Sequence, residues 1–297
     1  MPILTGTASW TDPTLLACGR FYPPTVRTPE ARLRYYATQF KLVEVDAPYY
    51  RLPDGHTAHA WAQRTPDDFA FHVKAFRLFT GHPAPLRDLP ADMQRELDAA
   101  PTVFYHQLPG ELQHELWQRF LIALEPLRMA DKLRAVHFQF APWIHRNPRG
   151  AALLRDCRRH MSEHLMAVEF RHRSWFENAS ASAWTLDFLR DAGMAHTVVD
   201  APQGFDNTVP AVWASTHPDL AVLRLHGRNA AAWNHHGNAS SGRFQYEYSP
   251  EELADLAQRL KRLAEQVRSA HAVVNTNYQD QGMRNAAGLA AALRAPS

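Results

Sequence analysis

Acidic, basic and imidazole side chains occur at alternate positions within short apolar segments of the sequence. Glu44 lies between Val43 and Val45, and Glu169 lies between two apolar residues. Alternation in a β-strand sends the polar side chains to one face and the apolar side chains to the other. Carboxylates that share a face with imidazoles and cations can bind an anion and transfer protons to and from it. This pattern therefore predicts acid–base chemistry on an anionic molecule.

The residues that we expect at this site fall into two sets. The expected catalytic residues are Glu44, Glu169, Asp200 and His226. The residues expected to bind the substrate are Trp10, Asp46, Tyr50, Lys74, Arg171, Arg224, Asn275 and Asn277. In this assignment Glu44 or Glu169 is the base and His226 shuttles the proton, while the cations hold a phosphate or carboxylate and the aromatic rings stack on a base or sugar.

Two other interpretations of the same charges stay open. The acids and bases could pair with one another and serve only to stabilise the core. Alternatively, His72, His137 and His226 could join the carboxylates around a divalent metal. No His-x-His or His-Glu-x-x-His motif occurs, so we predict no metal ligands and no cofactor, with a divalent metal as the alternative.

Eight segments have the length, the β-branched or aromatic content and the flanking residues of strands. They are Ile3–Ser9, Lys41–Ala47, Phe69–Ala75, Arg134–Phe140, Leu165–Arg171, Met194–Asp200, Leu220–His226 and His271–Asn277. Helix start signals stand between several of them. Thr28-Pro29 and Asn147-Pro148 each place a capping residue before a proline, and Ser249-Pro250-Glu251-Glu252 has the form of a capping box.

Eight strand–helix units in 297 residues predict one α/β domain over residues 1–297, a TIM-like (β/α)8 barrel. A doubly wound sheet would show a glycine-rich turn after its first strand, and none is present. The proline-rich interval 76–110 is expected to be an elaborated loop between strands three and four. In such a barrel the active site lies at the C-terminal ends of the strands, where most of the expected site residues fall.

The composition excludes several classes of protein. Lys plus Arg number 32 against 30 Asp plus Glu, so net charge alone would not hold this chain on nucleic acid or a membrane. Two cysteines cannot form a disulfide framework. No apolar segment approaches the roughly eighteen residues of a membrane span, and no signal peptide is evident. We therefore expect a cytoplasmic protein with no membrane partner, and the sequence predicts no particular oligomer.

The whole chain resembles the YecE-like family, also called the domain of unknown function 72 family. The most specific match is Glu169-Phe170-Arg171-His172-Arg173-Ser174-Trp175-Phe176. Further matches are Gly6-Thr7-Ala8-Ser9-Trp10, Tyr49-Tyr50-Arg51-Leu52-Pro53, Arg224-Leu225-His226-Gly227-Arg228 and Asn275-Thr276-Asn277. The resemblance implies a TIM-like barrel and no particular reaction. The chain departs from the family at Asp46-Ala47-Pro48, where the family usually has Asn-Ser-Thr.

Three functions follow from these patterns. The first is an enzyme, of hydrolase or lyase type, that acts by acid–base chemistry on a small phosphorylated or nucleotide-like molecule. The second is a nucleic-acid-binding or repair protein similar to barrel endonucleases, for which the basic stretch Arg149, Arg155, Arg158, Arg159 and His160 would contact phosphates. The third is a protein that binds a metabolite without turnover. The polar segment Asn234–Asn238 is a candidate lid or flexible loop.

Overall fold

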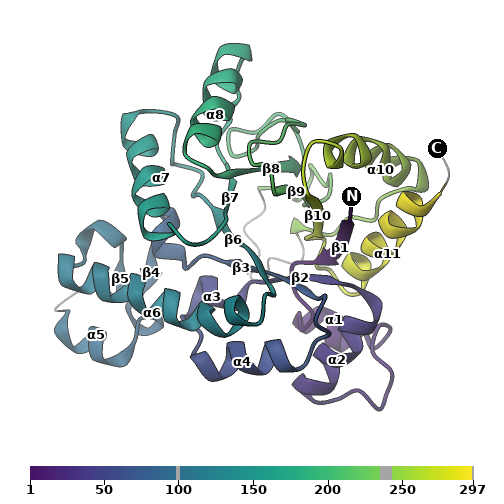
Figure 1. The fold of residues 1–297 in the computed structure, drawn as a ribbon, viewed down its shortest axis with the longest axis horizontal. Coiled ribbons are helices and arrows are strands. Elements are labelled where there is room, and N and C mark those ends of the chain that lie inside the picture. The colour runs from purple at the N-terminus through teal and green to yellow at the C-terminus, as the bar shows by residue number, and fades with distance from the viewer. Residues whose placement is uncertain (98–100, 235–242, 296–297) are drawn as a thin grey trace.

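Eight parallel strands close into a barrel in the computed structural model, which describes residues 1–97, 101–234 and 243–295 (Figure 1). The order around the barrel is β1-β10-β9-β8-β7-β6-β3-β2. The strands are β1 (Ile3–Thr7), β2 (Leu42–Val45), β3 (Ala70–Lys74), β6 (Leu133–Gln139), β7 (Met166–Glu169), β8 (Ala195–Asp200), β9 (Leu220–Leu225) and β10 (Ser269–Val274). All eight predicted strands are present, and the predicted TIM-like barrel is confirmed.

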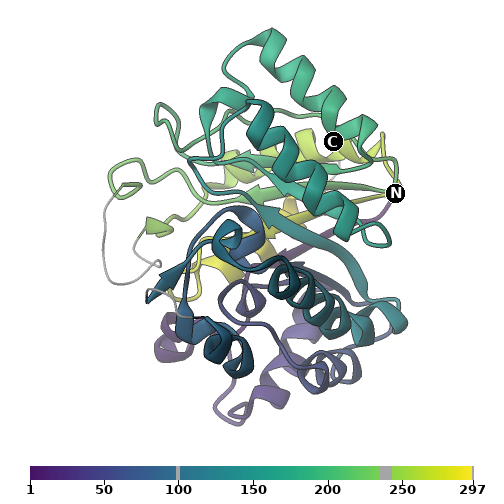
Figure 2. The ribbon, with the colours of Figure 1, turned by 90° about the vertical axis from the view of Figure 1, so that its left-hand side faces the viewer.

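Helices surround the strands on the outside of the barrel (Figures 1 and 2). They are α1 (Pro13–Cys18), α2 (Pro29–Gln39), α3 (Ala47–Tyr50), α4 (Gly55–Gln63), α5 (Ala91–Glu96), α6 (Gly110–Met129), α7 (Pro148–His160), α8 (Ala179–Asp191), α10 (Pro250–Ala264) and α11 (Gln281–Arg294). The predicted start signals hold: the side chains of Thr28, Asn147 and Ser249 each accept a hydrogen bond from a backbone N–H of the first turn. These bonds satisfy donors that the helix itself leaves unpaired.

The segment between β3 and β6 is elaborated, as predicted. It contains the 3-10 helices η1 (Arg77–Thr80), η2 (Leu86–Asp88) and η3 (Tyr105–Gln107), helix α5, and a two-stranded antiparallel sheet of β4 (Ala84–Pro85) and β5 (Thr102–Val103). A further 3-10 helix, η4 (Arg173–Trp175), follows β7. Between η3 and β6 the chain forms α6, whose buried residues Phe120 and Trp117 pack against Phe79 of η1.

The eightfold alternation of strand and helix fails at one position. Residues 201–219, which connect β8 to β9 and are all described, form no helix. The expectation of eight complete strand–helix units is therefore wrong at the sixth unit. Pro202, Gly204 and Pro210 interrupt this interval, and proline and glycine both disfavour a helix interior.

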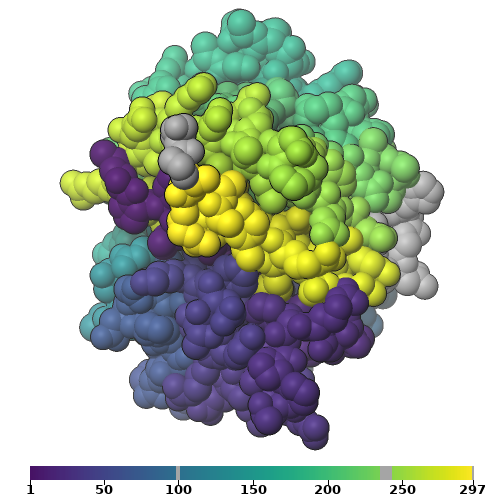
Figure 3. Space-filling model, turned by 90° about the vertical axis from the view of Figure 1, so that its right-hand side faces the viewer, coloured from purple at the N-terminus to yellow at the C-terminus, as the bar shows by residue number. Residues whose placement is uncertain are grey.

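The N-terminal and C-terminal strands are neighbours in the barrel. Each residue of Ile3–Thr7 in β1 aligns with a residue of Ala270–Val274 in β10. Figure 3 shows the consequence on the surface, where the yellow residues near the C-terminus lie against the purple N-terminal residues. None of the helices in the described part of the chain is long and apolar enough to cross a membrane.

Candidate functional site

Polar side chains fill the interior of the barrel at the C-terminal half of the strands, as the alternation predicts. Glu44, Glu169 and Arg224 are completely buried, and His72, His137 and His226 are also buried. Their apolar neighbours, such as Val168 and Leu223, belong to the core outside the strands. In these strands the polar side chains therefore face the barrel interior and their apolar neighbours face outward, as predicted.

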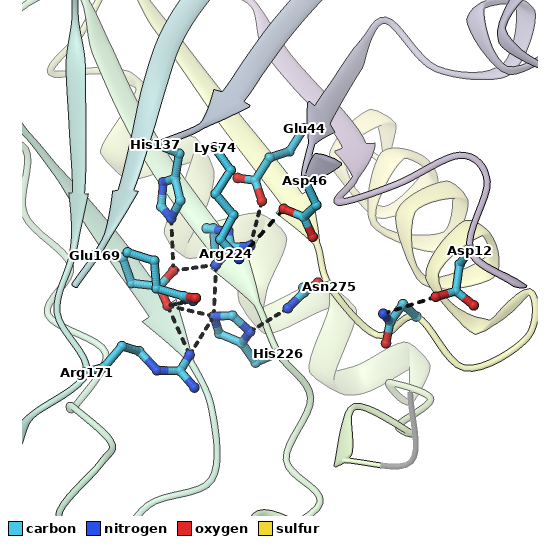
Figure 4. Close-up of polar contacts among 12 residues, drawn as sticks. Asp12, Glu44, Asp46, Lys74, His137, Glu169, Arg171, Arg224, His226 and Asn275 are labelled. Atoms are coloured by element: carbon cyan, nitrogen blue, oxygen red, sulfur yellow. Dashed lines mark hydrogen bonds and ion pairs between the residues drawn. The ribbon is translucent and has the colours of Figure 1, made fainter. Parts of the chain in front are cut away.

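Glu169, the last residue of β7, is the centre of this buried cluster (Figure 4). Its Oε1 accepts hydrogen bonds from Gln139 Nε2 at 2.7 Å and Arg171 Nη1 at 3.0 Å, and lies 3.0 Å from His226 Nε2. Its Oε2 accepts from Arg224 Nη1 at 2.6 Å and lies 3.4 Å from His137 Nε2. Both carboxylate oxygens are thus surrounded by donors.

The same contacts decide the charge of Glu169 and Arg224. Burial by itself raises the pKa of Glu169, but Arg224 and His226 lower it, and the net pKa lies well below the usual value. Burial lowers the pKa of Arg224, yet Glu44 and Glu169 raise it above the usual value. Arg224 Nη2 donates to Glu44 Oε1 at 2.6 Å, so the arginine joins two carboxylates. A carboxylate held in this way stays ionised near neutral pH and is a weak proton acceptor.

His226 is neutral and holds its proton on one defined nitrogen. Burial, opposed by Glu169, lowers its pKa to about 3. Because an ionised carboxylate only accepts, the 3.0 Å contact with Glu169 requires the proton on Nε2, and Nδ1 then accepts from Asn275 Nδ2 at 3.0 Å. Nη1 of Arg171 and of Arg224 lie 3.3 Å from the same Nε2. Both nitrogens of His226 are therefore already engaged.

Above this cluster, at the C-terminal ends of the strands, lies a cleft of about 770 Å³. Seven residues of the predicted site line it: Trp10, Asp46, Tyr50, Lys74, Arg171, Asn275 and Asn277. The other five do not line it: Glu44, Glu169, Arg224 and His226, which form the buried cluster, and Asp200. The structure therefore divides the predicted site into groups that a ligand can touch and a buried layer that supports them from below.

Lys74 and Asp46 face each other on one side of the cleft. Lys74 Nζ lies 3.8 Å from Asp46 Oδ1 and 4.6 Å from the centre of the Tyr49 ring. The ammonium group makes no hydrogen bond to any described residue, and Asp46 Oδ1 is buried without a hydrogen-bond partner there. Burial raises the pKa of Tyr49 to about 12, so its hydroxyl keeps its proton.

Several lining residues were not predicted. Asp12 caps α1 and accepts a hydrogen bond from Asn277 Nδ2 at 3.4 Å. Arg32 on α2, Arg64 at the end of α4, and Arg243 also line the cleft. Strand-end reasoning could not find Arg32 or Arg64, because both belong to helices that flank the mouth of the barrel.

Asp200 was expected at the site, but it does not line the cleft and makes no hydrogen bond to Glu169. Its carboxylate accepts from Nε and Nη2 of Arg228 at 3.1 and 2.8 Å, and from the hydroxyl of Tyr248 at 2.6 Å. Arg228 Nη1 also donates to Glu252 on α10 at 2.7 Å. This group joins the loop after β9 to α10. Neither Asp200 nor Arg228 lines the cleft that holds Lys74 and Arg171, and both line a separate cavity.

The remaining alternatives can be placed in the structure. His72 Nε2 lies 2.9 Å from His271 Nδ1, and no three His, Cys, Asp or Glu side chains in the described part of the chain are arranged to hold a metal.

On α7, Arg158 donates to the carbonyls of Ala192 and Met161, while Arg155 lies over the ring of Phe188. The candidate lid Asn234–Asn238 falls almost wholly outside the described residues.

The fold and the cleft together define an α/β protein of the TIM-barrel class with a polar cleft at the C-terminal ends of its strands. The family model described as "Protein of unknown function DUF72" matches residues 4–297. The chain belongs to this family, as the sequence resemblance predicted.

Relatives of the same family cover nearly the whole chain. The UPF0759 protein YunF of Bacillus subtilis strain 168 is 31% identical over 259 residues, which is 86% of this chain and 84% of that protein. A DUF72 family protein of Thermotoga maritima MSB8 has 26% identity and a TM-score of 0.78, covering 99% of this chain and 100% of its own. One from Enterococcus faecalis V583 has 23% identity and a TM-score of 0.80, covering 99% and 96%.

Proposed function

We propose that the protein binds a small anionic molecule, phosphorylated or nucleotide-like, in the cleft and acts on it by acid–base chemistry. One observation carries the proposal: Lys74 and Arg171 face the same cleft with hydrogen-bond donors that no described residue uses. Arg171 uses only Nη1, which donates to Glu169, and this leaves the rest of its guanidinium for a ligand. A planar guanidinium suits two oxygens of a phosphate or carboxylate, and an ammonium adds a compact charge.

The buried cluster has a positioning role in this proposal. Glu169 holds Arg171 through the 3.0 Å bond between Oε1 and Nη1, and Arg224 holds Glu169 in turn. Such supporting contacts orient the groups that touch a ligand and reduce the entropy lost on binding. Glu44, Glu169 and His226, which were expected to be catalytic, then act through Arg171.

Asp46 is the carboxylate best placed to transfer a proton. It lines the cleft beside Lys74, and its buried Oδ1 has no hydrogen-bond partner among the described residues. The nearby ammonium would stabilise charge that develops on the substrate. Trp10, Tyr49 and Tyr50 line the same cleft, and aromatic rings of this kind pack against a nucleobase or sugar.

Calorimetric titration with inorganic phosphate and with nucleoside monophosphates tests the binding step. Lys74→Met and Arg171→Met should each weaken binding about tenfold or more, since each removes a charge-assisted hydrogen bond. Arg159→Met is the matched control, because Arg159 is an exposed residue of α7 paired with Asp156. An equal loss in all three variants, or no binding by the native protein, would overturn the proposal.

The chemical step needs its own readout. Any ligand that binds is incubated with the protein and products are followed by ³¹P NMR. Asp46→Asn should keep the affinity and abolish product formation. Tight binding with no product from the native protein would establish a binding protein without turnover and reject the catalytic part. Affinity for oligonucleotides that falls steeply with salt and with changes at Arg155 and Arg158 would favour the nucleic-acid alternative instead.

A further inference from the structure

We infer that the ligand carries two anionic groups, and that Arg32 and Arg64 bind the second one across the mouth of the barrel from Arg171. This inference rests on the proposed function for the first group, which lies at Lys74 and Arg171. It adds a second subsite to the same cleft and so narrows the class of ligand.

The topology places Arg171 on the opposite side of the barrel from Arg32, while Lys74 ends β3, which is two strands from β7 and two from β1. Arg171 follows β7, and β7 is four strands from β1 in either direction around the closed barrel. Arg32 belongs to α2, which follows β1, and Arg64 is the C-terminal capping residue of α4, which follows β2. All three side chains line one continuous cleft. A ligand that contacts both Arg171 and Arg32 must therefore extend across the barrel mouth.

Arg32 has hydrogen-bond donors that an anion could occupy. Its guanidinium makes no hydrogen bond or ion pair with the described residues, and its Nε is buried without a partner. Burying an N–H without an acceptor costs about 1–3 kcal/mol, a cost that a bound anion would remove. Arg64 is only weakly engaged: its Nη2 lies 3.7 Å from Glu30 Oε2, while Glu30 Oε1 accepts from Arg34 at 3.0 Å.

Part of the wall of the cleft is apolar. The rings of Trp10 and Trp61 meet edge to face with centroids 6.1 Å apart, and both residues line the cleft together with Pro29 and Leu33. Indole rings pack well against a sugar or a planar base. The arrangement thus suits an anion at each end of a molecule and a ring between them.

The charge balance of the cleft supports a ligand with more than one negative charge. The basic residues that line its described part are Arg32, Arg64, Lys74, Arg171 and Arg243, and the acidic ones are Asp12 and Asp46. The excess of three cations raises the local concentration of anions. A cleft of about 770 Å³ has the size that holds a whole metabolite, not a single phosphate. The chemical class is a bisphosphate, or a phosphate ester that also bears a carboxylate.

Linear alkanediol bisphosphates of increasing length test the second subsite against the matching alkyl monophosphates. In the native protein the best bisphosphate should bind about tenfold or more tightly than its monophosphate, as one added charge-assisted contact requires. Arg32→Met and Arg64→Met should remove this preference and leave the monophosphate affinity unchanged. Lys74→Met should weaken both ligands.

Arg34→Met is the control, because Arg34 lies on the same helix, pairs with Glu30 and does not line the cleft. It should keep the bisphosphate preference. Thermal melts of each variant verify folding, and Arg64→Met serves if Arg32→Met does not fold. Equal affinity of the native protein for mono- and bisphosphates would overturn the second subsite and leave the proposed function standing. Failure of both ligands to bind would overturn the proposed function itself.

Discussion

The side-chain amide of Asn275 donates a hydrogen bond to Nδ1 of His226 across 3.0 Å, while Nε2 of the same ring lies 3.0 Å from Glu169. Asn275 lines the cleft, whereas His226 is buried below it. The amide thus couples a residue that a ligand can touch to the buried layer. It also fixes which nitrogen of the imidazole carries the proton.

Replacing Asn275 by Asp should change the protonation of His226. A carboxylate cannot donate to Nδ1, so a proton must enter the ring there, and the pKa of His226 should rise from its depressed value near 3. Imidazole ¹⁵N NMR at neutral pH measures this directly. The native protein should show neutral His226 protonated on Nε2. A native ring protonated on Nδ1 would contradict the hydrogen-bond scheme.

The buried histidines predict loss of stability in mild acid. Burial lowers the pKa of His226 and His271 to about 3 and that of His196 to about 4, against an ordinary 6.5. Below about pH 6.5 the unfolded chain binds protons that the folded protein excludes, so the stability present above that pH is lost as the pH falls toward the folded pKa values. The free energy of unfolding should fall by about 1.4 kcal/mol per pH unit for each histidine.

Urea unfolding between about pH 7.5 and about pH 5.5 measures this slope. The variant His271→Asn should show a shallower slope than the native protein. His59→Gln, at an exposed position of α4, should leave the slope unchanged. A free energy of unfolding that does not change over this range would show that these histidines are not neutral and buried.

Lys132 should contribute to stability although it lies far from the cleft. Its buried Nζ donates to the carbonyls of Ala62 and Thr65 at 2.6 and 2.7 Å, at the C-terminal end of α4. Lys132→Met leaves these acceptors without a donor and should lower the free energy of unfolding by about 1–3 kcal/mol. Lys41→Met removes an ion pair with Asp68 whose lysine is 63% exposed, and should cost under about 1 kcal/mol. Equal effects in denaturant titrations would refute the capping role.

Replacing Asp200 tests whether this carboxylate stabilises the fold or binds the ligand. Asp200→Asn weakens the pairing with Arg228 and Tyr248 and should destabilise the fold by about 1–2 kcal/mol, reduced by the partial exposure of Arg228. Its phosphate affinity, measured by calorimetry, should equal that of the native protein. Should the variant remain stable and lose binding, Asp200 would belong to the site after all.

Strand alternation identified the interior of the barrel because every polar residue concerned has apolar neighbours on both sides. Glu44, Glu169 and Arg224 satisfy this condition and are buried in the predicted phase. Asp200 follows Val198 and Val199, so its strand end shows no alternation; it ends β8 as expected but does not line the cleft. The pattern also contains no information on depth along the barrel axis. It could not show that Glu169 lies below the cleft while Arg171, two residues later, lines it.

The sequence did not predict the absence of a helix between β8 and β9, or the presence of Arg32 and Arg64 in the cleft. The two failures have different physical causes. The interval 201–219 lies between two clear strands, and a barrel template supplied a helix that its prolines and glycine do not support. Nothing in the sequence around Arg32 distinguishes it from an ordinary surface residue of a helix. Only the packing of α2 beside the loop after β1 brings it to the cleft, and this relationship is tertiary.

The pairing of β1 with β10 has a consequence for synthesis on the ribosome. β1 aligns with β10 over five residues, but with β2 only at Gly6–Leu42 and Thr7–Val43. The first strand to emerge therefore waits for the last before most of its backbone groups are paired. Until then the nascent barrel keeps an open strand edge, which is prone to pair with other chains. The protein should depend on protection from aggregation until translation is complete.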